Sequence, residues 1–239
     1  MTKIKICGLQ TVHHALTAAK AGADYLGMIF SEPSSRRISI DKGIEICSSV
    51  REALAGKRAP GLVGVFVNEN PDIINSYAEK CGLDLVQLSG DEEPSICKEL
   101  AVPIIKAIRI AADQSYQDTL PQIESWLSQM PALSAVLSSS TGRVEGPEGS
   151  LLHIEGKVEG RYGGTGHVME WSTATELAVH YRFLLAGGLT PDNVAQAIHQ
   201  VAPWGVDVSS GVETDGVKDP VKVLTFISKV KEADRVKAE

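Results

Sequence analysis

The sequence alternates between short strand-like segments and amphipathic helix-like segments along nearly its whole length. The clearest unit begins with a β-rich stretch at 62–67, followed by Asn70 and Pro71, which suit the cap and the first position of a helix. Gly82 ends that helix. Strands that each feed a helix pair in parallel. The apolar stripe of the helix is predicted to contain Ile73, Ile74, Tyr77, Ala78 and Cys81.

Eight such units can be traced, and their number constrains the architecture. An open doubly wound sheet usually stops at five or six strands, whereas eight units suit a closed barrel. We therefore predict an α/β fold, a single (β/α)8 TIM barrel over residues 1–235. The predicted strands lie at 3–8, 25–30, 62–67, 83–88, 103–108, 151–155, 183–186 and 206–208.

One interval departs from this rhythm, between the fifth and sixth predicted strands. A helix around 117–129 fills part of it, and an insertion is predicted around 131–150. The segment 133–138 is itself apolar enough to be the sixth strand. The pattern alone leaves both 133–138 and 151–155 as alternatives.

Charge and cysteine usage narrow the class of protein. The net charge is −7, without a run of lysine or arginine, which argues against a nucleic-acid partner or an anionic membrane surface. No apolar run is long enough to span a membrane, and the first residues do not resemble a signal peptide. The four cysteines lack CxxC spacing, so we expect no metal site and a cytoplasmic location.

In such barrels the working residues lie at the carboxyl ends of the strands. Three late strand ends are rich in glycine, at 163–166, 187–188 and 207–211. Glycine lets backbone N–H groups approach an oxyanion closely. These three ends together predict a site for one phosphate group.

Six sequence blocks resemble, in the same order, those of the phosphoribosylanthranilate isomerase family of tryptophan biosynthesis. They run from the first strand to the last helix. The blocks are KICG at 5–8, GVFVN at 64–68, VQL with GDE at 86–92, GGTG at 163–166, LAGGL at 185–189 and GVDVSSGVE at 205–213.

The resemblance implies an Amadori rearrangement, in which N-(5-phosphoribosyl)anthranilate becomes 1-(2-carboxyphenylamino)-1-deoxyribulose 5-phosphate. This is the third step from chorismate to tryptophan. An acid protonates the ring oxygen and opens the sugar to a Schiff base, and a base removes the C2 proton. The iminium is its own electron sink, so no cofactor is implied. A monomer or homodimer is expected; a different phosphosugar isomerase and a non-catalytic phosphosugar-binding barrel are the alternatives.

The resemblance assigns Cys7 as the general base and Glu155 as the general acid. A thiol needs a positive neighbour to ionise near neutral pH, and Lys5 lies on the same strand face. A buried, inert cysteine is the alternative. The family usually has aspartate at the position of Glu155, one methylene shorter. If 133–138 were strand six, that position would fall on Ser138, which is no comparable acid.

The remaining expected contacts are with the substrate. Arg36 matches the arginine that binds the anthranilate carboxylate, and its neighbour Arg37 is the rival. Gln87, Asp207 and Ser209 are expected to bind the rest of the substrate, while Ser89 stands where the family often has histidine. The phosphate is expected at Gly163, Gly164, Gly166, Gly187, Gly188, Ser210 and Gly211. The histidines are expected to be structural or solvated: His13, His14, His153, His167, His180 and His199.

Overall fold

The computed structural model describes residues 1–32, 34–130, 151–156 and 171–236. Within these ranges, eight parallel strands close into a barrel in chain order, with β1 hydrogen-bonded to β8. The predicted (β/α)8 fold is confirmed. The strands are β1 (Lys3–Cys7), β2 (Tyr25–Ile29), β3 (Gly61–Phe66), β4 (Leu85–Leu88), β5 (Ile104–Ile110), β6 (Leu151–Gly156), β7 (Phe183–Leu185) and β8 (Gly205–Val208).

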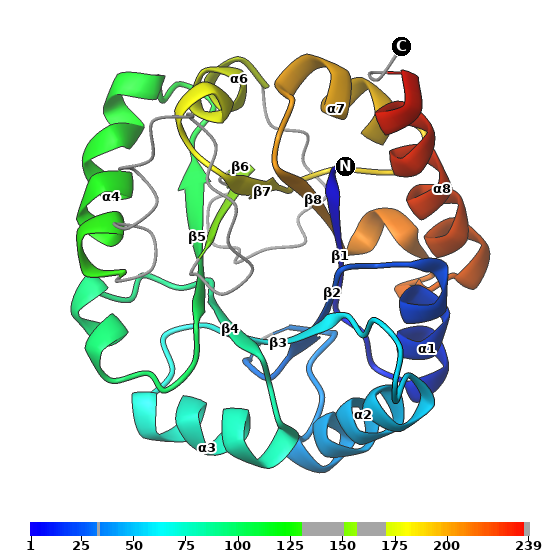
Figure 1. The fold of residues 1–239 in the computed structure, drawn as a ribbon. Helices are drawn as coiled ribbons and strands as arrows, with labels where there is room; N and C mark the ends of the chain where they lie inside the picture. The colour runs from blue at the N-terminus through cyan, green and yellow to red at the C-terminus, as the bar shows by residue number, and fades with distance from the viewer. Residues whose placement is uncertain (33, 131–150, 157–170, 237–239) are drawn as a thin grey trace.

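Helices surround the barrel as an outer ring (Figure 1). The third helix, α3, begins and ends as the sequence predicts: Asn70 is its N-cap, Pro71 its first residue, and Gly82 its C-cap with φ 62°. Short 3₁₀ turns lie at η1 (Pro94–Lys98) and η2 (Ser210–Val212). The helices are α1 (Val12–Ala21), α2 (Ile40–Ala53), α3 (Pro71–Cys81), α4 (Tyr116–Gln129), α6 (Trp171–His180), α7 (Val194–Val201) and α8 (Pro220–Val236).

The sixth strand is the later of the two alternatives. β6 pairs with β5, aligning Glu155 with Arg109, and with β7, aligning Ile154 with Leu185. Glu155 therefore lies at the carboxyl end of a barrel strand. The segment 133–138 and the predicted insertion at 131–150 lie outside the described residues.

The barrel interior has an apolar lower layer and a polar upper layer. Side chains alternate in and out along each strand, so residues two apart share a face. The lower layer is a buried apolar cluster, separate from the main core between strands and helices. Two residues further toward the carboxyl ends, β4 and β6 carry the buried polar side chains of Gln87 and His153. The lower layer contains Val63, Leu85, Ile105, Leu151 and Leu184; the upper layer, here called the interior polar cluster, contains Lys5, Gln87, His153, Glu155 and Asp207.

One helix prediction needs correction. Ile73, predicted to lie in the apolar stripe of its helix, is 43% exposed because it lies at the margin of that stripe. α7 begins at Val194, after a turn at 191–193 in which Asn193 is the cap. Among the described helices, none has the length and apolar character that crossing a membrane requires.

Candidate active site

An ion pair and a hydrogen bond tie the first, sixth and eighth strands together inside the barrel. Lys5 Nζ and His153 Nε2 both lie 2.9 Å from the same oxygen, Oδ2 of Asp207. All three side chains are nearly inaccessible to solvent. Burial alone raises the pKa of the Asp207 carboxyl, but Lys5 and His153 outweigh it and the pKa is lowered. Asp207 is thus a stable buried carboxylate.

Cys7 ends β1, two residues beyond Lys5 on the same face, and is buried. It lies against Gly27 of β2, where an added Cβ would be 2.8 Å from Sγ. Burial raises the pKa of the thiol, and the ammonium groups of Lys5 and Lys218 oppose that rise without reversing it. The expected cationic neighbour is therefore present.

Glu155 is buried near the end of β6. Burial is the largest cause of the raised pKa of its carboxyl, and the nearby Asp207 charge adds to it. His153, Arg109 and Lys5 act in the opposite direction. A raised pKa keeps a carboxylic acid protonated toward neutral pH, which suits a proton donor.

Gln87 and Ser89 face the same interior on β4 and its end. Gln87 Nε2 donates to Ser89 Oγ over 2.9 Å, and both side chains are buried. This bond orients the amide, and Oε1 of Gln87 has no hydrogen-bond partner among the described residues. Ser89 therefore orients Gln87 within this site.

Arg36 lies at the rim, in a network with the loop that follows β8. Its Nε and Nη2 donate to the two carboxylate oxygens of Glu213 over 2.7 and 2.8 Å. Glu213 also accepts from Lys218, because the two residues face each other in the small hairpin of β9 (Glu213–Thr214) and β10 (Val217–Lys218). An added Cβ on Gly8 would meet both Arg36 Cδ and Lys218 Nζ, so this network adjoins Cys7.

Arg37, the alternative to Arg36, has other partners. It donates to the backbone oxygen of Phe30 over 3.1 Å and pairs with Glu32 over 2.6 Å. Its side chain is 48% exposed, against 16% for Arg36. Of the two arginines, Arg36 is the one beside the residues of the site.

The two described glycine-rich ends come close to each other. Gly187 and Gly188 follow β7 with φ of 90° and 65°, values that disfavour a side chain. Gly211 packs on that same loop: an added Cβ would lie 1.8 Å from the backbone oxygen of Leu189. Ser210 precedes it in η2. Gly163, Gly164 and Gly166 lie outside the described residues.

Unpartnered polar atoms gather at the carboxyl ends of the strands. Of six buried side-chain N or O atoms that lack a hydrogen-bond partner among the described residues, five belong to interior positions of β4, β6 and β8 or to the residue just after β8. Buried polar atoms in proteins are nearly always satisfied, so such a group indicates a place for a polar ligand. The five are Gln87 Oε1, His153 Nδ1, Glu155 Oε1, Asp207 Oδ1 and Ser209 Oγ.

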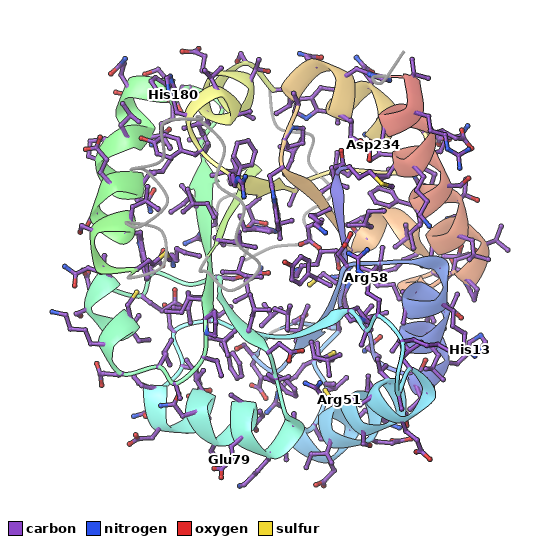
Figure 2. All side chains as sticks on the ribbon, viewed as in Figure 1. His13, Arg51, Arg58, Glu79, His180 and Asp234 are labelled. Carbon is purple, nitrogen blue, oxygen red and sulfur yellow. The ribbon has the colours of Figure 1, made fainter. Side chains whose placement is uncertain are left out.

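Sequence reasoning missed three members of this site. His153 was expected to be structural or solvated, yet it faces the barrel interior together with Glu155. The available signal was its position two residues before Glu155, which places both side chains on the same face of the strand. The other described histidines are different, since His13 and His180 lie on the outer ring (Figure 2). Lys218 and Glu213 were missed because strands of two residues leave no periodic pattern.

Residues 4–229 match the family model described as N-(5'phosphoribosyl)anthranilate (PRA) isomerase. An N-(5'-phosphoribosyl)anthranilate isomerase from Roseiflexus castenholzii is 45% identical over 235 residues, covering 97% of this chain and 99% of that one. The isomerase from Dehalococcoides mccartyi is 36% identical over 234 residues, covering 98% of both chains.

Solved structures agree. The crystal structure of phosphoribosyl anthranilate isomerase from Thermotoga maritima superposes with a TM-score of 0.77 at 30% identity, covering 97% of this chain and 100% of that one. A second isomerase structure, in complex with reduced 1-(o-carboxyphenylamino)-1-deoxyribulose 5-phosphate, gives a TM-score of 0.74 at 28% identity, with the same coverage.

Proposed function

The chain belongs to the N-(5'-phosphoribosyl)anthranilate isomerase family of tryptophan biosynthesis, and we propose that it performs this isomerisation with Glu155 as general acid and Cys7 as general base. The observation that carries the assignment is the pairing of a buried carboxylic acid of raised pKa with a thiol that lies beside two ammonium groups. Both residues end strands of one barrel.

Glu155 opens the sugar ring. Its proton passes to the furanose oxygen, the C1–O bond breaks toward that oxygen, and the anthranilate nitrogen forms the C1=N bond of the iminium. The carboxylate left behind is stabilised by the positive charges of Arg109 and Lys5, which favour its charged form. The surroundings of Glu155 thus favour the protonated acid before the step, and nearby positive charges balance its carboxylate after the step.

Cys7 then removes the C2 proton. Its thiol pKa is raised in the free protein, so the thiolate has to form with substrate bound. The iminium adds a positive charge beside it and draws the thiol pKa down, in the same direction as Lys5 and Lys218. The electrons of the C2–H bond form the C1=C2 bond while the electrons of the C1=N bond return to nitrogen, which gives the enolamine. Protonation at C1 with loss of the proton of the C2 hydroxyl then gives the ketone.

The other site residues place the substrate. Arg36 keeps three N–H donors beyond the two that Glu213 uses, and these suit the anthranilate carboxylate. The orphan oxygens of Gln87, Asp207 and Ser209 suit ribose hydroxyls. Backbone N–H groups at Gly187, Gly188, Ser210 and Gly211, with Gly163, Gly164 and Gly166, suit the phosphate.

A cytoplasmic location and a monomer or homodimer complete the proposal. Cys7, Cys47, Cys81 and Cys97 are all free thiols, which supports a reducing compartment. The structure of a Thermotoga maritima relative is described as a monomer form of a dimeric isomerase, which supports considering both states.

The test is conversion of freshly prepared phosphoribosylanthranilate, followed by the loss of its fluorescence. We expect Cys7→Ala and Glu155→Gln each to lower kcat by about 10²- to 10⁴-fold, the usual contribution of acid or base catalysis. Glu155→Asp keeps the acid but withdraws it by one methylene, so it should retain more activity than Glu155→Gln. Wild-type turnover that survives Cys7→Ala would contradict the assignment of the base.

Full activity of Glu155→Gln would contradict only the assignment of the acid. Arg37→Met serves as a matched control for Arg36→Met, because Arg37 is half exposed and pairs with Glu32 instead of Glu213. We expect Arg36→Met to raise KM and Arg37→Met to leave it near wild type.

A further inference from the structure

His153 is a buried histidine with one ring nitrogen bound and the other unused. Its side chain is 3% exposed, Nε2 lies 2.9 Å from Asp207 Oδ2, and Nδ1 has no partner among the described residues. No step of the proposed acid–base reaction gives this nitrogen a contact.

The hydrogen bond to Asp207 fixes which nitrogen carries the proton. Asp207 is a carboxylate that also accepts from Lys5 Nζ, so it cannot donate, and Nε2 must be the N–H donor. In the neutral imidazole, Nδ1 then carries a lone pair and accepts hydrogen bonds.

The contacts around the ring suit an acceptor at Nδ1. Lys5 already balances the charge of Asp207, and a second buried cation would lack a counter-ion. An imidazolium would also leave a buried Nδ1–H without an acceptor, a costlier defect than an unused lone pair. Nδ1 is thus a fixed acceptor inside the barrel.

Glu155 is the next residue on the same strand face, about 7 Å further along the strand axis. Its Oε1 is also unpartnered, so the two side chains do not bond each other. A ligand that presents one oxygen to the protonated Glu155 and another to Nδ1 satisfies both side chains. The oxygen at Glu155 has only to accept, so the ring oxygen of the sugar suits it. The oxygen at Nδ1 has to donate, so it must belong to a hydroxyl, because an ether oxygen or a carboxylate cannot donate.

We propose that His153 Nδ1 is a substrate-binding acceptor that takes a hydrogen bond from a ribose hydroxyl next to the oxygen protonated by Glu155. This inference rests on the proposed function and deepens it. The Lys5–Asp207–His153 chain then contributes to substrate binding as well as to packing. Lys5 holds the Asp207 carboxylate in place, Asp207 determines the tautomer of His153, and in that tautomer Nδ1 accepts a hydrogen bond from a hydroxyl.

Three variants separate the two ring nitrogens. His153→Gln can still donate to Asp207 but has no acceptor at the place of Nδ1. His153→Asn retains a polar atom near Nδ1 but does not reach Asp207. His153→Leu removes both contacts. We expect His153→Gln to raise KM about tenfold while kcat changes less, the loss typical of one buried hydrogen bond. His153→Leu should lose more, and His199→Leu, on an exposed helix face, should behave as wild type.

Binding gives a readout that a structural role would not move. Reduced 1-(o-carboxyphenylamino)-1-deoxyribulose 5-phosphate and analogues lacking one hydroxyl at a time would be titrated into wild type and His153→Gln by calorimetry. For one analogue, the missing hydroxyl should weaken binding to wild type about tenfold and leave binding to His153→Gln almost unchanged.

Two results would overturn the proposal. One is wild-type KM and affinity in His153→Gln, since the Asp207 contact alone would then account for His153. The other is an equal loss for every analogue in both proteins. A wild type that binds the reduced product but does not isomerise phosphoribosylanthranilate would contradict the proposed function instead, and the analogue titration would still decide the role of Nδ1.

Discussion

Lys5 Nζ lies 2.9 Å from Asp207 Oδ2, and this buried ion pair joins the first strand of the barrel to the last. The two residues are also direct neighbours in the β1–β8 register. The pair therefore links the two strands that close the barrel, and it also keeps Asp207 ionised within the site. Its contribution to stability and its contribution to the chemistry can be separated, because they respond to different substitutions.

Removing Lys5 should be strongly destabilising. Lys5→Met leaves Asp207 as a buried charge without its cation, which typically costs about 3–5 kcal/mol of unfolding free energy. Lys3→Met is the matched control on the same strand, because the Lys3–Asp24 pair is partly exposed and such pairs are typically worth under about 1 kcal/mol. Urea unfolding of both variants measures the difference. Equal losses would mean that Asp207 does not depend on Lys5.

The buried acid should make stability depend on pH in a defined direction. The pKa of Glu155 is raised in the folded protein above its ordinary value of 4.5, so the folded state holds a proton that the unfolded state has lost. Stability therefore falls as pH rises from about 4.5 through the folded pKa. Glu155→Gln removes this loss, so its stability relative to wild type should increase over that range, by about 1.4 kcal/mol per unit of pKa shift.

Thermal unfolding of wild type and Glu155→Gln between pH 4 and pH 8 checks this. Glu124→Gln, an exposed carboxylate on α4, is the control and should show no comparable trend. A stability difference that is the same at every pH would show that Glu155 is not titrating in the folded protein in the stated direction.

Lys218 should influence the pH dependence of turnover. Starting from the free enzyme, the reaction requires the state with Glu155 protonated and Cys7 ionised, even though the thiolate forms with substrate bound. The ordinary pKa of a glutamate, 4.5, lies far below that of a cysteine, 9.0, and burial raises both. The profile of kcat/KM is then a plateau that ends on the alkaline side at the pKa of Cys7. Lys218 lowers that pKa, so Lys218→Met should raise it, which lowers the plateau and moves the alkaline limb to higher pH.

Each unit of added pKa lowers the plateau about tenfold. Lys222→Met is the matched control, because Lys222 donates to the backbone oxygen of Glu213 over 2.7 Å and is not among the groups that shift Cys7. An alkaline limb that stays in place in Lys218→Met would count against an effect of Lys218 on the thiol.

Gly211 should tolerate no side chain. Its Cβ would collide with the backbone oxygen of Leu189, so Gly211→Ala has to displace the loop after β7 or the loop after β8. We expect a loss of stability of about 1–3 kcal/mol and weaker competitive inhibition by inorganic phosphate. Gly56→Ala, with open space around it and φ of 73°, should lose only about 1 kcal/mol from backbone strain. If inhibition by inorganic phosphate were unchanged in Gly211→Ala, Gly211 would not contribute to the phosphate site.

The sequence predicted the barrel well because its signals are local. Asn70, Pro71 and Gly82 each act on their own helix, and the alternation of units fixes the number of strands. The position of Glu155 depended on choosing the right sixth strand, which the β5–β6–β7 pairing decides. The pattern could not supply what depends on contacts between distant strands.

Two residues illustrate this limit. A histidine gives no periodic signal of its own, so the role of His153 appears only when β8 brings Asp207 beside it. The pKa of the Cys7 thiol depends on the competition between burial and nearby charge, and hence on the depth of the site. Depth is a property of the closed barrel and is not encoded in any short stretch of sequence.

The contact between Lys5 and Asp207 spans 202 positions of the chain, and this separation has a consequence for biosynthesis. During translation, β1 leaves the ribosome long before β8, and until then its outer edge has no hydrogen-bonding partner. A chain that stops before residue 205 has neither the closing strand nor the carboxylate that orients His153. Truncated products of this gene would therefore be inactive and prone to edge-to-edge association, and enzyme activity in a cell extract would count only completed chains.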